Sequence, residues 1–187
     1  TLLDMLLNSK SLKLGCKLED FKLISTDENI ENYYSLSKTN GLVIAFICNH
    51  CPYVKDIIER MVLDFSYLNS IEIGTAAVMP NDVKKYPEDS FEKMKIFSKE
   101  NHFTFSYLFD EHQTFAKALN AVCTPDFFCF NQDRKLFYRG RLDNIGYRKT
   151  NISRVSELKN ACKKMVYERK ITETQHNSMG CSIKWKK

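Results

Sequence analysis

The sequence predicts an α/β fold with a central mixed β-sheet flanked by helices. Continuous apolar runs at residues 42–47 and 71–79 are typical of strands buried on both faces. Between them, apolar residues recur at helical spacing over residues 51–69. Later, apolar segments at residues 126–131 and 135–141 flank a short polar turn, which indicates an antiparallel hairpin. Parallel and antiparallel strands should therefore share one sheet.

The remaining predicted elements lie before these segments or between them. The run "FKLIS" at residues 21–25 predicts a first strand. After a polar passage, Ser90 stands where a helix cap is expected, and Phe91, Met94 and Phe97 follow at helical spacing. We therefore expect an inserted helix in this region.

Three more elements follow the inserted helix. "YLFD" predicts a short strand, and "QTFAKALNAV" predicts a short helix. A last amphipathic helix is expected over residues 153–169, with one apolar side. That side comprises Val155, Leu158, Cys162, Met165 and Val166. No linker or repeat divides the chain, so residues 1–187 are expected to form a single domain.

Composition narrows the classes of partner. The chain has 187 residues and a formal net charge of +5, and its lysines fall in short clusters. No basic stripe interleaved with aromatic residues indicates nucleic-acid binding. No apolar run reaches the ~20 residues that cross a bilayer. We expect neither a nucleic-acid nor a membrane partner.

Cysteine usage predicts a reducing compartment. The chain has seven cysteines, an odd number, and those outside the 48–51 segment show no spacing typical of a disulfide framework. The opening "TLLDMLLNSK" carries Asp4 inside a short apolar stretch and makes a poor signal peptide. A cytoplasmic location is therefore expected.

The segment "FICNHCPYVK" holds the candidate active site. Cys48 and Cys51 are two residues apart, a spacing that is weak by itself in a cysteine-rich chain. Here, however, the pair lies at the carboxyl end of a predicted buried strand and opens a predicted helix. A helix N-terminus stabilises a thiolate, which is the reactive form of cysteine. Pro52 is compatible with a helix start.

The order of these features resembles the thioredoxin superfamily: a strand, Cys-x-x-Cys, a helix, Thr124–Pro125, a hairpin and a final helix. The insertion at residues 80–110 resembles redoxins close to alkyl hydroperoxide reductase and thiol-specific antioxidant proteins. The blocks "NHCPYVK", "YPEDS", "TPDFFCF", "YRGRLDN" and "GCSIKW" are similar to those of a bacterial thioredoxin-family subgroup, and the resemblance runs from about Leu14 to Trp185. The resemblance implies a thioredoxin-like fold with a redoxin-type insertion and with Pro125 in cis beside the cysteines.

The chain departs from ordinary thioredoxins around the motif. Ile47 precedes the pair, and Asn49 and His50 lie within it. Leu42 stands where thioredoxins have a buried aspartate. His50 resembles the histidine of disulfide isomerases, which stabilises the thiolate of the first cysteine. That similarity implies a more oxidising couple than the ~−270 mV of thioredoxin; the open alternative is a solvated residue at a helix start.

The predicted activity is thiol–disulfide exchange. Cys48 would attack a protein or small-molecule disulfide, and Cys51 would resolve the mixed disulfide. Thr124 and Pro125 would line the substrate groove and leave an exposed backbone edge for an extended peptide. A reductase or thiol donor is the expected partner. No cofactor and no metal are expected, because the cysteines themselves carry the electrons.

Two alternatives stay open. A peroxiredoxin-like thiol peroxidase needs Pro-x-x-x-Thr-x-x-Cys, but alignment on Cys51 places Cys48 at the threonine and Ile44 at the proline. Arg141 could supply the required guanidinium, although pairing with a carboxylate such as Asp143 is more typical. The second alternative is copper binding of the Sco type. That class separates its cysteines by three residues, and His102 and His112 lie in no motif.

Cys181 is a possible third thiol. In "GCSIKW", Gly180 permits a close approach of the chain, and Cys181 would then act as an exchange partner for the pair. An unpaired cysteine in the tail is the other interpretation. Cys123 would lie near the site if the fold is right. Cys16, Cys129 and Cys162 are interpreted as small apolar core residues.

Overall fold

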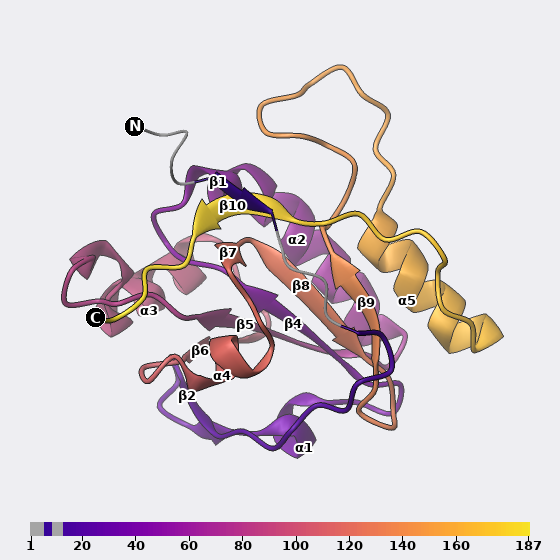
Figure 1. Ribbon diagram of the computed structural model, residues 1–187, viewed down its shortest axis with the longest axis horizontal. Helices are drawn as coiled ribbons and strands as arrows, with labels where there is room; N and C mark the ends of the chain where they lie inside the picture. The colour runs from indigo at the N-terminus through magenta and orange to yellow at the C-terminus, as the bar shows by residue number, and fades with distance from the viewer. Residues whose placement is uncertain (1–5, 9–12) are drawn as a thin grey trace.

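The computed structural model describes residues 6–8 and 13–187 (Figure 1). The prediction about the opening segment lies outside the described residues, apart from 6–8. Within the described part, seven strands form one sheet in the order β3-β2-β6-β5-β4-β8-β9. They are β2 (Leu23–Ser25), β3 (Ile30–Glu31), β4 (Leu42–Phe46), β5 (Gly74–Met79), β6 (Ser106–Phe109), β8 (Asp126–Phe130) and β9 (Leu136–Gly140).

A second, small sheet has the order β1-β10-β7. Its strands are β1 (Leu6–Asn8), β7 (Cys123–Thr124) and β10 (Met179–Ser182). The helices are α1 (Tyr33–Leu36), α2 (Pro52–Ser70), α3 (Phe91–Glu100), α4 (Thr114–Ala118) and α5 (Glu157–Glu168). In Figure 1 the C-terminal strand β10 lies between β1 and β7, close to the first turns of α2. Strands from the beginning and the end of the described chain are thus paired beside this helix.

The large sheet is mixed, as the sequence predicts. The central strand β4 pairs in parallel with β5 and antiparallel with β8. Strands β8 and β9 form the predicted hairpin. The fold is thioredoxin-like, and α3 belongs to the insertion between β5 and β6. The expectation from the resemblance is therefore confirmed.

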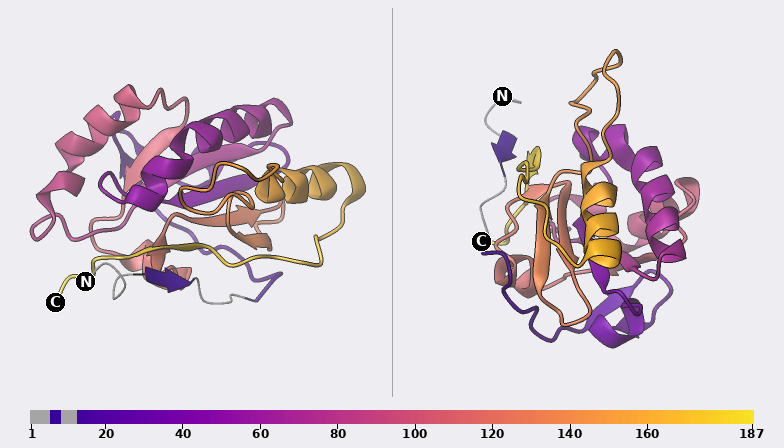
Figure 2. Two further views of the ribbon diagram at one scale, coloured as in Figure 1. Left: turned by 90° about the horizontal axis from the view of Figure 1, so that it is seen from above. Right: turned by 90° about the vertical axis from the view of Figure 1, so that its right-hand side faces the viewer.

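The residues of β4 contribute in turn to two layers of the hydrophobic core, one on each face of the sheet. Val43 and Ala45 belong to the cluster that includes residues of α2, α3 and α5. Ile44 and Phe46 belong to the cluster that includes residues of α1 and α4. Side chains of a strand point alternately to opposite faces, so a run of apolar residues fills both. Figure 2 shows α2, α3 and α5 together on one side of the sheet.

Helix α2 begins one residue later than predicted. Pro52 is its first residue, and Cys51 is its N-cap with extended backbone angles. Proline suits this position because its missing N–H would have no partner in the first turn. Strand β4 ends at Phe46, so a short link at the carboxyl edge of the sheet carries Cys48. Only Cys51 therefore borders the helix.

The inserted helix begins as expected. The side chain of Ser90 accepts a hydrogen bond from the backbone N–H of Lys93 at 3.3 Å, which caps α3. A short 3₁₀ turn, Pro87–Asp89, immediately precedes this cap. The turn buries Asp89 completely. This buried carboxylate becomes important at the active site.

Some expected boundaries are wrong. Residues 71–73 are a turn rather than part of β5, and Glu72 has a left-handed φ of 61°. Val155 precedes α5 and is 47% exposed, so it does not belong to the apolar side of that helix. The strands of the small sheet are also absent from the sequence-based prediction. They have two to four residues each, too few for a clear periodic pattern.

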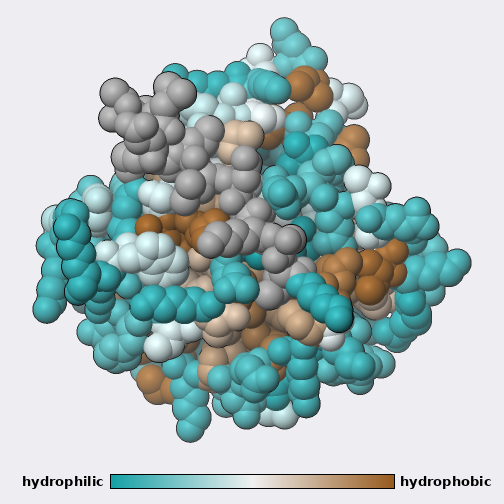
Figure 3. All heavy atoms as spheres, in the orientation of Figure 1, coloured by the Kyte–Doolittle hydropathy of each residue, from teal (hydrophilic) through white to brown (hydrophobic). Residues whose placement is uncertain are grey.

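The described surface is largely hydrophilic. On the face seen in Figure 3, apolar residues form separate patches surrounded by hydrophilic ones. None of the helices in the described part of the chain has both the length and the apolar character of a membrane span.

Candidate active site

The structure brings the two motif cysteines together with Thr124. The sulfur of Cys48 lies 3.5 Å from the hydroxyl oxygen of Thr124, and the sulfur of Cys51 lies 3.3 Å from its carbonyl oxygen. Cys48 is 1% exposed and Cys51 is fully buried. The Thr124–Pro125 peptide bond is cis, as the resemblance implies. These residues come from the ends of β4 and β7, far apart in the sequence.

Cys181 joins this pair from the C-terminal strand. Strand β10 pairs antiparallel with β7, which places Cys181 opposite Thr124. The side chain of Cys181 packs on the buried core cluster that contains Cys48 and Cys51. Gly180 permits the contact, because a Cβ at this position would lie 2.0 Å from the carbonyl oxygen of Thr124. Three cysteines therefore meet at one place.

The expected open backbone edge beside Thr124 is wrong. Strand β10 pairs with this edge, and the backbone N–H of Ile183 donates to the carbonyl of Val122 at 2.9 Å. Thr124 is 1% exposed as a result. An edge strand is normally covered or paired because its free backbone groups attract other strands. Here the chain itself supplies the covering strand.

The contacts that stabilise a thiolate lie at Cys51. Hydrogen bonds from the thiols of Cys181 and Cys48 hold the pKa of Cys51 well below its usual range, although burial opposes them. In its neutral form Cys51 instead has the Thr124 carbonyl as an acceptor. Burial raises the pKa of Cys48, and its bond to Cys51 and the charge of Asp89 add to this effect. These interactions favour a thiolate at Cys51 over one at Cys48, the reverse of what the sequence predicts.

The exact start of α2 adds to this difference. A helix stabilises negative charge only within its first turn. Cys51 is the N-cap, whereas Cys48 lies three residues earlier, in the buried link after β4. The first-turn advantage expected for Cys48 therefore falls to Cys51.

His50 is held by a buried carboxylate. Its Nδ1 lies 2.6 Å from Oδ2 of Asp89, which is fully buried. This hydrogen bond raises the pKa of His50, and partial burial lowers it by less. Asp89 also accepts from the backbone N–H of Asn49 at 2.9 Å and from the amide of Asn81 at 2.8 Å. The carboxylate thus orients both the imidazole and the loop between the cysteines.

Asn49 fixes the other side of this loop. Its amide donates to the carbonyl of Glu88 at 3.1 Å, and its oxygen accepts from the hydroxyl of Tyr107 at 2.8 Å. Tyr107 is fully buried in β6. The Cys-Asn-His-Cys segment is therefore anchored to the insertion and to a neighbouring strand. Asp89 lies in the block "YPEDS", but nothing in the sequence alone links it to His50.

One group of possible metal ligands occurs among the described residues. Ligand atoms of Cys48, His50 and Asp89 lie within 4.8 Å of one another. Both oxygens of Asp89 already accept hydrogen bonds, and one of them contacts the imidazole. His102 and His112 are exposed and do not belong to this group. Asp89 therefore fits the role of a carboxylate that orients His50 better than that of a ligand in a copper site.

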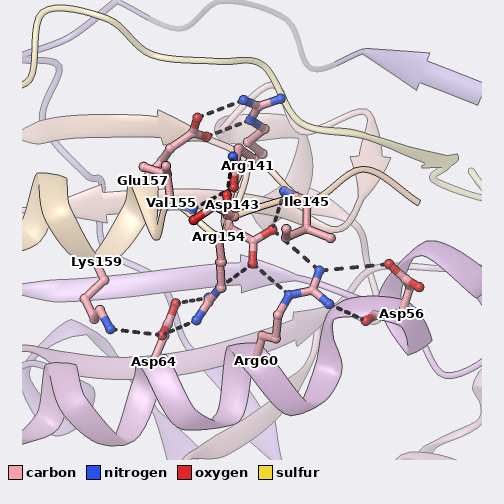
Figure 4. A network of polar contacts seen from close by, with 12 residues as sticks. Asp56, Arg60, Asp64, Arg141, Asp143, Ile145, Arg154, Val155, Glu157 and Lys159 are labelled. Carbon is pink, nitrogen blue, oxygen red and sulfur yellow. Dashed lines mark hydrogen bonds and ion pairs between the residues drawn. The ribbon is translucent and has the colours of Figure 1, made fainter. Parts of the chain in front are cut away.

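Arg141 does not pair with Asp143. Its guanidinium donates to both carboxylate oxygens of Glu157, at 2.6 and 2.8 Å. Asp143 instead accepts from Arg60 and Arg154, each at 2.8 Å (Figure 4). Arg141 therefore pairs with a carboxylate as expected, although the partner is Glu157 rather than Asp143, and its guanidinium is not free for a peroxide.

A cavity of about 400 Å³ adjoins the cis proline. Pro125, Tyr53 and Met179 contribute to its lining, together with Tyr147. The rings of Tyr53 and Tyr147 stack with their centroids 4.5 Å apart. The cavity therefore offers an aromatic and apolar surface beside Pro125.

The other cysteines differ from these three. Cys129 and Cys162 are fully buried and in contact, with their sulfurs 3.9 Å apart, as expected of core residues. Cys123 is buried in β7 next to Thr124, and burial raises its pKa. Cys16 is only partly buried, although the sequence predicts a core residue at this position.

Fold and site together define a thioredoxin-like protein with a cluster of redox-capable thiols. The model of the AhpC/TSA family matches residues 14–139, about two thirds of the chain. The chain therefore belongs to the AhpC/TSA family, within the thioredoxin superfamily. No curated protein matches the sequence.

Solved structures agree with this assignment. An uncharacterised conserved protein from Geobacillus kaustophilus is 37% identical, with 97% of this chain and 96% of that one covered and a TM-score of 0.92. A hypothetical protein from Sinorhizobium meliloti is 30% identical, with 96% and 98% covered and a TM-score of 0.90. Peroxidoxin BcpB from Mycobacterium tuberculosis shares the fold at 14% identity, with 83% and 94% covered and a TM-score of 0.59.

Proposed function

We propose that this protein is a thiol–disulfide oxidoreductase that cycles Cys48 and Cys51 between a dithiol and a disulfide. The observation that carries the proposal is the geometry at Thr124. Both sulfurs contact this residue, immediately before a cis proline and at the carboxyl end of the central strand. Ligands of open α/β sheets bind at this edge.

The distribution of charge favours Cys51 as the attacking sulfur. Its thiolate forms a bond to one sulfur of a substrate disulfide, and the other sulfur leaves as a thiolate. Cys48 then loses its proton and attacks Cys51, which releases the second substrate thiol. Two electrons pass from the protein to the substrate, and the Cys48–Cys51 disulfide remains. A reductase or thiol donor reverses the internal step. These roles are the reverse of those expected from the sequence.

His50 would assist the internal step. Asp89 binds Nδ1 and raises the pKa of the imidazole, so the ring carries positive charge over a wider pH range. A cation at this place favours the thiolate forms of the neighbouring cysteines. We therefore assign His50 an electrostatic role and Asp89 a positioning role.

The residues around the cysteines favour a substrate with an apolar group beside its disulfide. This substrate would be a protein or a small molecule. The cavity beside Pro125 presents the stacked rings of Tyr53 and Tyr147. All seven cysteines are free thiols in the structure, which fits the reducing, cytoplasmic environment that we propose.

Redox titration tests the proposal. The protein would be equilibrated in buffers with different ratios of reduced to oxidised glutathione, and its disulfides mapped by peptide mass spectrometry. We expect a single two-electron transition that links Cys48 and Cys51. Cys48→Ala and Cys51→Ala should each abolish this disulfide, whereas Cys16→Ser, the control, should keep it. A wild-type protein whose two thiols never bridge would refute the proposal.

Peroxide reduction is a second candidate, favoured by the environment of Cys51. This residue caps α2, precedes Pro52 and carries the stabilised thiolate. Its attack on a hydroperoxide would yield an alcohol and a sulfenic acid, which a neighbouring thiol would convert to a disulfide and water. Rapid consumption of one equivalent of peroxide, lost in Cys51→Ser and retained in Cys16→Ser, would support this activity. Slow consumption that is equal in both variants would exclude it.

A further inference from the structure

We propose that Cys181 is the third thiol of the redox centre: it forms a disulfide with Cys51 and passes electrons between the buried pair and outside substrates. This inference rests on the proposed exchange between Cys48 and Cys51, but it replaces the direct attack of Cys51 on the substrate with an attack by Cys181.

The first argument is the place of β10. An extended substrate would be expected to pair with the backbone before the cis proline, and β10 occupies this edge. Cys181 lies directly opposite Thr124 in the register, and Gly180 is packed against the carbonyl of Thr124 and the ring of Pro125. Strand β10 thus occupies the place expected for a bound peptide. Its residue Cys181 lies opposite Thr124, next to the motif of Cys48 and Cys51.

The second argument is the surroundings of Cys51. The side chain of Cys181 packs on the core cluster that contains Cys48 and Cys51, and it lowers the pKa of Cys51. The sulfurs of Cys48 and Cys51 both contact Thr124, which lies opposite Cys181 in the register. Cys51 thus has two cysteines in its surroundings with which it can form a disulfide.

The third argument is exposure. Cys48 and Cys51 are buried, whereas Cys181 is partly exposed. While β10 stays paired with β7, an outside disulfide meets Cys181 before it meets the other two sulfurs. The buried pair therefore exchanges with the outside through this cysteine.

The steps balance without another reactant. Cys181 loses its proton to solvent and attacks a substrate disulfide, forming a mixed disulfide and releasing one substrate thiolate, which takes up a proton from solvent. Cys51 then attacks the sulfur of Cys181 and releases the second substrate thiolate. Cys48 attacks Cys51 and passes its proton to that thiolate, so Cys181 is freed as a thiolate. One substrate disulfide becomes two thiols, and the protein ends with the Cys48–Cys51 disulfide.

Trapping tests the bond directly. In Cys48→Ser the last step cannot occur, so oxidised glutathione should leave most molecules with a Cys51–Cys181 disulfide, detected by non-reducing peptide mapping. The double variant Cys48→Ser/Cys181→Ser should instead keep glutathione on Cys51 or remain reduced. If Cys48→Ser carries glutathione and never forms the Cys51–Cys181 bond, the inference is overturned.

Kinetics tests the route, with Cys181→Ser as the variant and Cys16→Ser as the control. We expect Cys181→Ser to slow exchange with oxidised glutathione at least tenfold and Cys16→Ser to leave the rate unchanged. An equal or faster rate in Cys181→Ser would show that β10 is a cover and not a relay. The disulfide present at the end of the reaction distinguishes failure of this inference from failure of the proposed function. Slow formation of the Cys48–Cys51 disulfide in Cys181→Ser supports both, and its complete absence in wild type contradicts the proposed function itself.

Discussion

At the residue scale, Asp89 controls the state of His50. Because the carboxylate raises the folded-state pKa of His50 above 6.5, the pair stabilises the fold fully below pH 6.5. This contribution is lost as the pH rises through the raised pKa. His50 is the only member of the motif whose charge changes near neutral pH in the free state.

Replacing Asp89 with asparagine should therefore lower the pKa of His50 towards 6.5, as followed by NMR of the imidazole protons. The variant should also lower the free energy of unfolding by about 1–3 kcal/mol, because Asn49 and Asn81 lose a charged acceptor. Glu88→Gln, beside it in the same turn, is the control and should change the titration much less. An unchanged pKa in Asp89→Asn would contradict the positioning role.

The same residue shows what the sequence could and could not predict about the site. Cys48, Cys51 and Thr124 were predictable because each lies in a short motif at a predicted strand end. Asp89 lies 39 residues from His50, and only the fold brings the turn before α3 to the cysteine loop. The preference for a thiolate at Cys51 depends mainly on Cys181, which only the fold brings to the motif. It also depends on the residue at which α2 starts, which is finer than apolar periodicity can define.

At the scale of elements, strand β10 depends on Gly180. A side chain here would meet the carbonyl of Thr124, which belongs to the backbone and cannot move aside. Gly180→Val should therefore detach β10, lower the free energy of unfolding by about 1–3 kcal/mol and speed the alkylation of Cys48 and Cys51. The neighbouring Met179→Ala, at a half-exposed position, is the matched control. Equal alkylation rates in both variants would argue against the pairing of β10 with β7.

A network of ion pairs joins helix α2 to the segment after β9. The Asp143 side chain is nearly buried and is shared by Arg60 and Arg154, while Arg154 also binds Asp64 of α2 at 2.6 Å (Figure 4). Removal of one partner leaves buried charges uncompensated.

Asp143→Ala should therefore cost about 3–5 kcal/mol of unfolding free energy in urea denaturation. Glu157→Gln tests the more exposed pair with Arg141 and should cost about 0–1 kcal/mol. If the two variants are equally stable, the network around Asp143 does not hold these elements together.

At the scale of the whole molecule, the large sheet follows from local patterns and the small one does not. The run at residues 42–47 predicts a central strand because both of its faces lie in the core. Strand β10 has four residues and pairs with β7, more than fifty residues earlier. Such a contact has no local signature. The covering of the substrate edge is therefore a property of the folded chain that emerges only in three dimensions.

One redox centre arises from this arrangement, with Cys51 at its middle and a partner thiol on either side. The most direct test is the thiolate absorbance at 240 nm of the reduced protein as a function of pH. We predict a thiolate already present at neutral pH in the wild type and in Cys48→Ser, absent in Cys51→Ser, and shifted to higher pH in Cys181→Ser, which removes the strongest donor. A thiolate that forms only near pH 9.0, the ordinary value for cysteine, or one that disappears in Cys48→Ser but persists in Cys51→Ser, would contradict the account.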